Sequence, residues 1–341
     1  MIFSYQARQN LKRVLTVLLH CLIVAVAMVL CCLLWLQRFV VYTDEGVRLD
    51  FDLPEITEAV TVPQRPTASQ IPIEYVDEKT PIDTPQEDEV ILQQWLDGYY
   101  IDVYTLIADP MVLVEQLEAL PAGTPILVDI KSYFGYYYYS STLGSTTSQS
   151  NVAQVDAFFA YLAESDLYTI ARFPALRDYD FADKNYSCAI WKTNGSVYQD
   201  ANRSLWLDPS KDATLGHLIQ IIKELRDLGF DEVVLQDFQI PAGDDINYTN
   251  RTEALETAAQ ALVTACASDQ FLVSFVASEQ FTKIPESRSR LYLMQVAAAD
   301  VAEIIASAQL TDPERQVVII AETYDTRYEV GNTLHPLDQA H

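Results

Sequence analysis

Hydrophobic and polar residues follow three different patterns along the 341-residue chain. Residues 14–36 are apolar and contain no charged side chain, whereas residues 37–88 show neither helical nor alternating periodicity. From residue 89 onward, short apolar runs alternate with segments whose apolar residues recur at helical spacing, a pattern typical of buried strands and amphipathic helices. We therefore divide the chain into a tail (1–13), an apolar segment (14–36), a linker (37–88) and a domain (89–341).

The apolar segment 14–36 is long enough to cross a membrane as one helix. At about 1.5 Å per residue such a helix covers about 34 Å, and the hydrocarbon core of a bilayer is about 30 Å thick. Arg8, Lys12 and Arg13 precede the segment, and acidic residues follow it. Because basic flanks remain in the cytoplasm, the pattern predicts a single-pass anchor in the cell membrane, with a cytoplasmic N-terminus and an extracytoplasmic domain.

A cleaved signal peptide is the alternative interpretation of this segment. The apolar core of a signal peptide usually has 7–15 residues and ends at small side chains. Here the run is longer, and it ends in Leu34, Trp35 and Leu36. We therefore favour a retained anchor. The proline-rich linker that follows is typical of an extended spacer, within which residues 41–53 are expected to form a short strand.

The domain alternates strand-type and helix-type segments. Expected strands cover residues 98–106, 125–130, 167–173, 232–238, 271–276, 291–296 and 316–321. Expected helices cover residues 110–120, 151–164, 215–228, 251–267 and 301–310. Ser150 and Asn250 precede two of these helices and are expected to cap them. Strands that alternate with crossover helices form parallel sheets, so we predict an α/β fold, a (β/α)8-type TIM barrel with an incomplete set of units, and keep an open doubly wound sheet as the alternative.

Acidic residues outnumber basic ones by 48 to 22, which gives a formal net charge of −26. Such a surface repels nucleic acid and anionic lipid headgroups, so we expect neither as a partner. The sequence has no residue spacing typical of a metal site and no glycine-rich phosphate loop, so we expect no cofactor. Cys188 and Cys266 are the only cysteines after the apolar segment, and the sequence leaves open whether they form a disulfide.

Reactive side chains of a parallel barrel stand at the C-terminal ends of its strands. In this sequence the ionisable residues at these ends include Asp129, Lys131, Arg172, Asp237 and Glu279. Paired carboxylates supply the acid and the base or nucleophile of glycoside hydrolysis. Aromatic side chains that can pack on sugar rings are also available nearby, among them Trp206, Phe238 and the tyrosine run 136–139. We therefore predict a polysaccharide substrate and catalytic roles for Asp237, Glu279 and Asp129.

Each of these residues also has a purely structural interpretation. Asp129 and Lys131 point to the same side of their strand and are able to form an ion pair. Asp237 is able to pair with Arg172 or to cap the following loop, and an exposed loop position would account for Glu279. For Asp237 we favour the site interpretation, because a charge that ends an apolar strand is costly to bury.

The segment GFDEVVLQDFQIP (residues 229–241) resembles the hallmark of a bacterial family of membrane-anchored, glycoside-hydrolase-like proteins with a TIM-type barrel. That hallmark reads Gly-Phe-Asp-Glu, a short apolar run, Asp-Tyr, an apolar residue and Arg-Phe-Pro. Three further stretches are similar to family motifs in the same order: ILVDIKSYFGYYYYSS, IARFPALRD and GSVYQDANRSLWLDPS. The resemblance covers residues 90–280 and implies five candidate site residues: Asp129, Lys131, Arg172, Asp208 and Asp237.

The chain departs from this hallmark beside Asp237, where Phe238 and Gln239 replace the Tyr and Arg. Loss of a cation beside a carboxylate changes its pKa and its contacts with substrate. Two functions therefore stay open: a glycoside hydrolase acting on an envelope or extracellular polysaccharide, or a catalytically inactive glycan-binding or envelope-scaffolding protein on a degenerate barrel. For the hydrolase, the expected substrate-binding residues are Lys131, Arg172, Trp206, Asp208, Phe238 and Gln239.

Overall fold

The computed structural model describes residues 40–43, 46–49 and 95–337, apart from positions 244, 247 and 324. The predicted tail, the apolar segment 14–36 and most of the linker lie outside the described residues. Among the helices that the structure does describe, none combines the length and the apolar character needed to traverse a bilayer. In the unit that precedes the domain, β1 (Val40–Thr43) and β2 (Gly46–Leu49) pair as an antiparallel hairpin, where we expected a single short strand.

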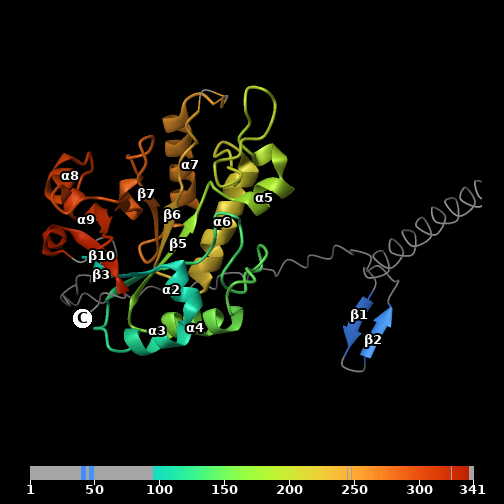
Figure 1. Cartoon of the computed structure of the whole chain (residues 1–341), viewed down its shortest axis with the longest axis horizontal. Helices are drawn as coiled ribbons and strands as arrows, with labels where there is room; N and C mark the ends of the chain where they lie inside the picture. The colour runs from blue at the N-terminus through green and yellow to red at the C-terminus, as the bar shows by residue number, and fades with distance from the viewer. Residues whose placement is uncertain are drawn as a thin grey trace, which may run out of the picture. The chain divides into compact units, whose positions relative to one another are not determined.

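Eight parallel strands of the domain close into a barrel (Figure 1). In chain order they are β3 (Asp97–Ile101), β4 (Pro125–Asp129), β5 (Tyr168–Pro174), β6 (Glu232–Gln236), β7 (Leu272–Val276), β8 (Leu291–Met294), β9 (Val317–Ile320) and β10 (Asn332–Pro336). The last strand pairs with the first, with Leu334 of β10 opposite Gly98 of β3. This closure confirms the TIM-type barrel and excludes the open doubly wound sheet.

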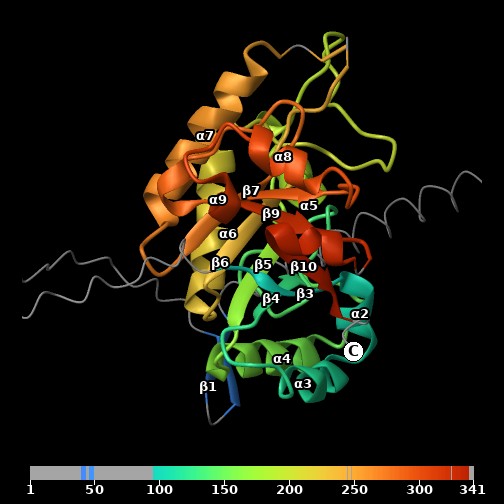
Figure 2. The ribbon, with the colours of Figure 1, turned by 90° about the vertical axis from the view of Figure 1, so that its left-hand side faces the viewer.

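Helices cover the outside of the barrel unevenly (Figure 2). The α-helices are α2 (Val103–Ala108), α3 (Pro110–Leu117), α4 (Val152–Glu164), α5 (Tyr179–Lys184), α6 (Asp212–Asp227), α7 (Arg251–Cys266), α8 (Val301–Ser307) and α9 (Pro313–Gln316). Short 3-10 helices are η3 (Tyr186–Cys188), η4 (Glu286–Arg288) and η5 (Thr326–Val330). Between β7 and β8, the described residues 277–290 contain no helix other than η4. The expected shortage of complete units therefore concerns the helices, while all eight strands are present.

Local side-chain chemistry shifts several elements away from their predicted positions. The expected strand 98–106 ends early, because the Asp102 carboxylate accepts a hydrogen bond from the Thr105 backbone and begins α2. Asn250 has a left-handed backbone with φ of 55° and forms no side-chain cap, so the predicted cap of α7 is wrong. Ser150 donates to the Tyr138 carbonyl instead of capping α4.

The N-terminal end of the barrel interior holds a buried ion pair. Arg290 Nη1 lies 2.6 Å from Glu232 Oε2, and neither side chain has solvent-accessible surface. The hydroxyls of Tyr168 and Tyr292 donate to the same carboxylate at 2.8 and 3.0 Å. The Glu232 charge is therefore enclosed and hydrogen-bonded at this end, which makes the pair a structural feature.

Candidate active site at the C-terminal mouth of the barrel

Strand alternation brings four interior side chains to the C-terminal mouth of the barrel. Asp129, Arg172, Gln236 and Met294 each lie two residues beyond an interior residue of β4, β5, β6 or β8. Arg172 donates two hydrogen bonds to Asp129, with Nε 2.6 Å from Oδ1 and Nη2 2.9 Å from Oδ2. Burial would lower the pKa of Arg172, but the adjacent Asp129 outweighs burial and raises it. A bidentate ion pair therefore links two neighbouring strands at the mouth.

Lys131 is paired with Asp178 and not with Asp129. Its Nζ lies 2.6 Å from Asp178 Oδ2, and His217 Nε2 lies 3.0 Å from the same oxygen. All three side chains are buried, and His217 stacks on Phe181 with ring centroids 3.8 Å apart. Burial would raise the pKa of Asp178, but Lys131 and His217 hold it well below its usual range. The alternative of an Asp129–Lys131 ion pair is thus wrong, and Lys131 ties the end of β4 to α5 and α6.

Asp237 directly follows β6 and has a left-handed backbone, with φ of 52°. Non-glycine residues rarely adopt this conformation, and those that do are frequent at functional sites. The carboxylate accepts no hydrogen bond from the described residues, and Arg177 Nη1 lies 3.9 Å from its Oδ2. Burial raises the pKa of Asp237, while Arg177 and Arg172 oppose this rise and Asp200 adds to it. Asp237 is therefore a mostly buried carboxyl group whose pKa is raised and whose nearest cation is Arg177.

Arg177, which follows β5, supplies the cation beside Asp237. We expected this cation to be missing, because position 239 is a glutamine. Arg177 Nη2 lies 2.6 Å from Asp200 Oδ2, and its guanidinium carbon lies 4.1 Å from the centre of the Tyr133 ring. The guanidinium is thus fixed between two carboxylates and against an aromatic ring, so another strand end provides the charge that the sequence seemed to lack.

Trp206 is buried and holds the Asp200 carboxylate of this cluster. Its Nε1 donates to Asp200 Oδ2 at 3.1 Å, and the Ser204 backbone donates to Oδ1 at 2.9 Å. Burial would raise the pKa of Asp200, but these hydrogen bonds and Arg177 lower it. Trp206 therefore contributes to the mouth by holding Asp200, and through it Arg177, in place.

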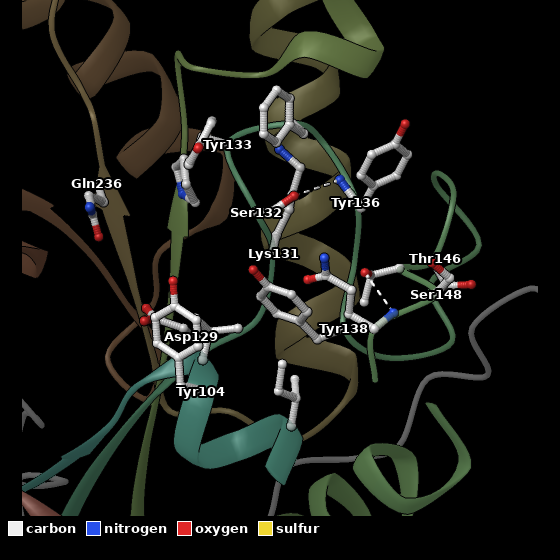
Figure 3. Close-up of a pocket in the computed structure, with 16 residues that line it drawn as sticks. Tyr104, Asp129, Lys131, Ser132, Tyr133, Tyr136, Tyr138, Thr146, Ser148 and Gln236 are labelled. Atoms are coloured by element: carbon white, nitrogen blue, oxygen red, sulfur yellow. Dashed lines mark hydrogen bonds between the residues drawn. The ribbon is translucent and has the colours of Figure 1, made fainter. Parts of the chain in front are cut away.

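A cavity of about 670 Å³ opens at the mouth beside Asp129 (Figure 3). Its wall is formed by the ends of β4, β5 and β6, the start of α2 and the loop between β4 and α4. Aromatic and uncharged polar side chains dominate the lining, including Tyr104, Tyr133, Tyr136, Tyr138, Thr146 and Gln149. Within the described part of the chain, Asp129 and Lys131 are the only charged residues that line it. The size and lining are typical of a small-molecule or sugar site.

The loop between β4 and α4 is fixed by a carboxylate of α6. Glu224 accepts hydrogen bonds from the hydroxyls of Tyr139 and Ser141, each at 2.7 Å. It also accepts from the backbone nitrogen and the hydroxyl of Thr142, at 2.9 and 3.0 Å. Of the tyrosine run, Tyr136 and Tyr138 line the cavity while Tyr139 contacts Glu224. The outer wall of the cavity is therefore preformed.

Two predicted site residues after β6 have different surroundings. Phe238 is buried and packs on Phe275 and Phe281, with ring centroids 4.9 and 5.1 Å apart. Gln239 is half-buried. Neither residue belongs to the lining of the cavity beside Asp129. Phe238 thus anchors the loop after Asp237 to the core instead of presenting its ring to the cavity.

Asp208 and Glu279 also lie outside the lining of this cavity. Asp208 accepts a hydrogen bond from the Tyr248 hydroxyl at 2.8 Å and lines a different cavity, of about 650 Å³, next to α6 and α7. Glu279 is exposed in the turn after β7. The structure therefore gathers Asp129, Arg172 and Asp237 at one mouth, and of the predicted site residues it is Asp129 and Lys131 that line this cavity.

Tyr104 and Glu224 contribute to this site without any signal that we recognised in the sequence. Tyr104 falls in the expected strand 98–106. If Asp102 had been recognised as an N-cap, Tyr104 would have been predicted at the start of a helix at the mouth. Glu224 lies on the polar face of α6, where a solvated acid is the usual interpretation.

Within the described residues, no cluster of three or more His, Cys, Asp or Glu could hold a metal ion. Cys188 and Cys266 are buried free thiols.

Comparison with known proteins yields a family and a fold. Residues 114–315, more than half of the chain, match a family model described as "Putative glycosyl hydrolase domain". Among solved structures, the GH36 α-galactosidase AgaA of Geobacillus stearothermophilus is 13% identical with a TM-score of 0.50, over 71% of this chain and 39% of that one. The match thus spans about two fifths of the galactosidase, and at this identity it concerns the fold alone.

Two further solved structures are similar over larger shares of their own length. The glycoside hydrolase domain of PelA from Pseudomonas aeruginosa is 14% identical with a TM-score of 0.41, over 69% of this chain and 86% of that one. A hypothetical protein from Ruminiclostridium thermocellum is 23% identical with a TM-score of 0.43, over 52% of this chain and 96% of that one. No curated protein matches the chain.

Proposed function

The chain belongs to the family whose model is described as "Putative glycosyl hydrolase domain", and from that premise we propose that its barrel cleaves glycosidic bonds of an envelope or extracellular polysaccharide. The observation that carries the proposal is the state of Asp237. Its carboxyl group is mostly buried at the barrel mouth, free of hydrogen bonds from the described residues, and burial raises its pKa. Enzymes use burial in this way to raise the pKa of a general acid toward the working pH.

Asp237 acts in this proposal as the acid that protonates the leaving-group oxygen. Asp129 is the second carboxylate, because it lines the cavity and both groups interact with Arg172. Asp129 supplies negative charge to the oxocarbenium-like transition state, as nucleophile or as base for a water molecule. Glu279, which we expected to be the first partner of Asp237, is exposed in the turn after β7 and ranks behind Asp129.

The release of reducing ends from envelope polysaccharide by the full chain tests this function. Asp237→Asn should lower the rate by a factor on the order of 10²–10⁴, the usual contribution of a general acid. Asp227→Asn is a matched control, because Asp227 is 74% exposed on α6, and it should leave the rate unchanged. An unchanged rate in Asp237→Asn would exclude Asp237 as the acid.

A catalytically inactive glycan-binding protein is the second candidate function. One observation favours it: Asp129 is held in a bidentate pair with Arg172, and Asp237 and Glu279 both lie outside the cavity lining, so no unpaired carboxylate among the described residues lines the cavity. Glycan binding that survives Asp237→Asn, without product from either form, would support this candidate. Loss of product formation together with retained binding would support the hydrolase.

We also propose that residues 14–36 tether the barrel to the outer face of the cell membrane. The proposal is supported by the length of the apolar run, its basic N-terminal flank and the proline-rich spacer that follows it. The full chain should stay in the membrane fraction after carbonate extraction, and protease added outside intact cells should digest the barrel. A barrel protected from external protease would contradict this orientation.

A further inference from the structure

We propose that the cavity beside Asp129 binds an uncharged stretch of a glycan chain, built of hexose or N-acetylhexosamine units, and rejects uronic acids. This inference deepens the proposed function, because it assigns a substrate class to the same barrel mouth. It depends on three features of the cavity: the compensation of its charges, its neutral hydrogen-bonding groups and its exposed aromatic rings.

Both charged side chains that line the cavity are already compensated inside the protein. Asp129 receives two hydrogen bonds from Arg172, at 2.6 and 2.9 Å. The Lys131 ammonium group lies 2.6 Å from Asp178, and both side chains are only 1% exposed. A uronate carboxylate entering this space would lose its hydration without gaining an unpaired cation, which is strongly unfavourable. The net charge of −26 adds a long-range repulsion.

The remaining polar groups of the lining are neutral. Thr146, Ser148 and Gln149 offer hydroxyl and amide groups, which both donate to and accept from sugar hydroxyls. Burial, reinforced by Asp129, raises the pKa of Tyr138 to about 12, so its hydroxyl remains protonated across the physiological range. Figure 3 shows Tyr138 between Asp129 and the side chains of Thr146 and Ser148 in that view. This set of groups matches the hydrogen-bonding pattern of a neutral sugar ring.

Two aromatic rings at the cavity are accessible from solvent. Tyr104 is 79% exposed and Tyr136 is 41% exposed, although both line the cavity. Exposed rings with a large apolar face are costly to leave in water, and the apolar faces of sugar rings pack well on them. Glu224 fixes the loop that carries Tyr136, so little conformational entropy is lost when a glycan binds.

Binding of the full chain to an array of neutral, uronate-bearing and amine-bearing oligosaccharides tests the inference. Binders should belong to the neutral group, and Tyr104→Ala and Tyr136→Ala should each weaken their binding by about threefold to tenfold. Tyr186→Ala is the matched control, because Tyr186 is 51% exposed but does not line the cavity. It should bind like the wild type.

A gain of charge provides the converse experiment. Gln149→Lys places an uncompensated cation in the cavity wall, and it should create measurable binding of uronate-bearing oligosaccharides. Gln260→Lys makes the same chemical change on the exposed face of α7 and should not. Equal uronate binding by the two lysine variants would show that recognition takes place outside this cavity and would overturn the inference.

The outcomes separate this inference from the proposed function. Binding of uronate-bearing oligosaccharides by the wild type would overturn the inference and leave a glycan-directed function intact. Binding of neutral oligosaccharides that is unchanged in Tyr104→Ala and Tyr136→Ala would have the same meaning. Absence of binding to every group on the array would overturn both. Binding confined to neutral oligosaccharides and weakened in both tyrosine variants would support the inference whether or not the bound glycan is cleaved.

Discussion

The barrel interior holds an arginine–carboxylate pair at each end, and the two pairs differ in their access to water. Arg290 and Glu232 at the N-terminal end have no exposed surface, whereas the Arg172 and Asp129 side chains at the mouth are 7% and 18% exposed. Two tyrosine hydroxyls complete the first pair, and a cavity of about 670 Å³ borders the second. The same kind of ion pair thus stabilises the fold where it is sealed and is accessible to solvent where a cavity reaches it.

Removal of Arg290 should produce the largest effect, and it should act on stability. We expect Arg290→Met to lower the free energy of unfolding by about 3–5 kcal/mol, because Glu232 would keep a buried charge without its partner. Denaturant unfolding of the full chain measures this change. Glu232→Gln combined with Arg290→Met should recover part of the loss, and a loss below about 1 kcal/mol in the single variant would contradict a sealed pair.

The corresponding change at the mouth should cost less stability. We expect Arg172→Met to lower the free energy of unfolding by about 1–2 kcal/mol, because the Asp129 carboxylate is able to recruit water through the cavity. Product formation or glycan binding should fall at least about tenfold in the same variant, since Asp129 loses its orientation. Equal stability losses for the Arg172 and Arg290 variants would remove the distinction between the two ends.

Asp237→Asn should raise stability at neutral pH while it removes activity. Burial raises the folded-state pKa of Asp237 above its unfolded value, so the stability that its protonated form contributes is lost as pH rises through the folded pKa. Asn cannot ionise and avoids this loss. The melting temperature of Asp237→Asn should therefore exceed that of the wild type at pH 7, and the difference should vanish below the unfolded pKa of about 3.9. Melting curves from pH 3 to 8 measure it, and a lower melting temperature at pH 7 would be the contrary result.

Arg177→Gln should have the smallest effect, confined to the pH dependence. Arg177 opposes the rise in the pKa of Asp237, so its removal should raise this pKa further. The limb of the pH–rate profile that belongs to Asp237 should move to higher pH, and Arg177→Lys, which keeps the charge, should move it less. The stability difference between proteins with Asp237 and with Asn at this position should likewise shift to higher pH when Arg177 is replaced. This measurement needs no substrate. A profile that does not move would show that Arg177 only supports the loop.

The apolar runs of the sequence predicted most strands of the barrel. They did not predict β10, and this failure has a physical reason. Asn332, Thr333 and His335 interrupt the apolar pattern of that strand, yet all three are buried. The Asn332 side chain accepts a hydrogen bond from the Leu96 backbone and donates to the Val317 carbonyl, at 2.8 and 3.0 Å. These partners are remote in sequence, so nothing local shows that a polar residue at this position will be buried.

The candidate site was predictable where it follows from position along a strand. Asp129, Arg172 and Asp237 were recognised because they end apolar runs, and a parallel barrel collects such ends at one mouth. The partners of Lys131 and Arg177 were not predictable, because Asp178 and Asp200 come from the irregular segment after β5, which has no periodicity. Which acid forms an ion pair with which base therefore depends on how that segment folds.

Closure of the barrel also constrains the order in which the protein can fold. The hydrogen bond from the Leu96 backbone to the Asn332 side chain joins positions 236 residues apart. Until β10 has been synthesised, β3 and β9 both present open strand edges, which are prone to pair with other chains. A nascent chain that has reached only β9 cannot complete the cylinder, so we expect it to depend on chaperones and to acquire protease resistance only once β10 has emerged from the ribosome.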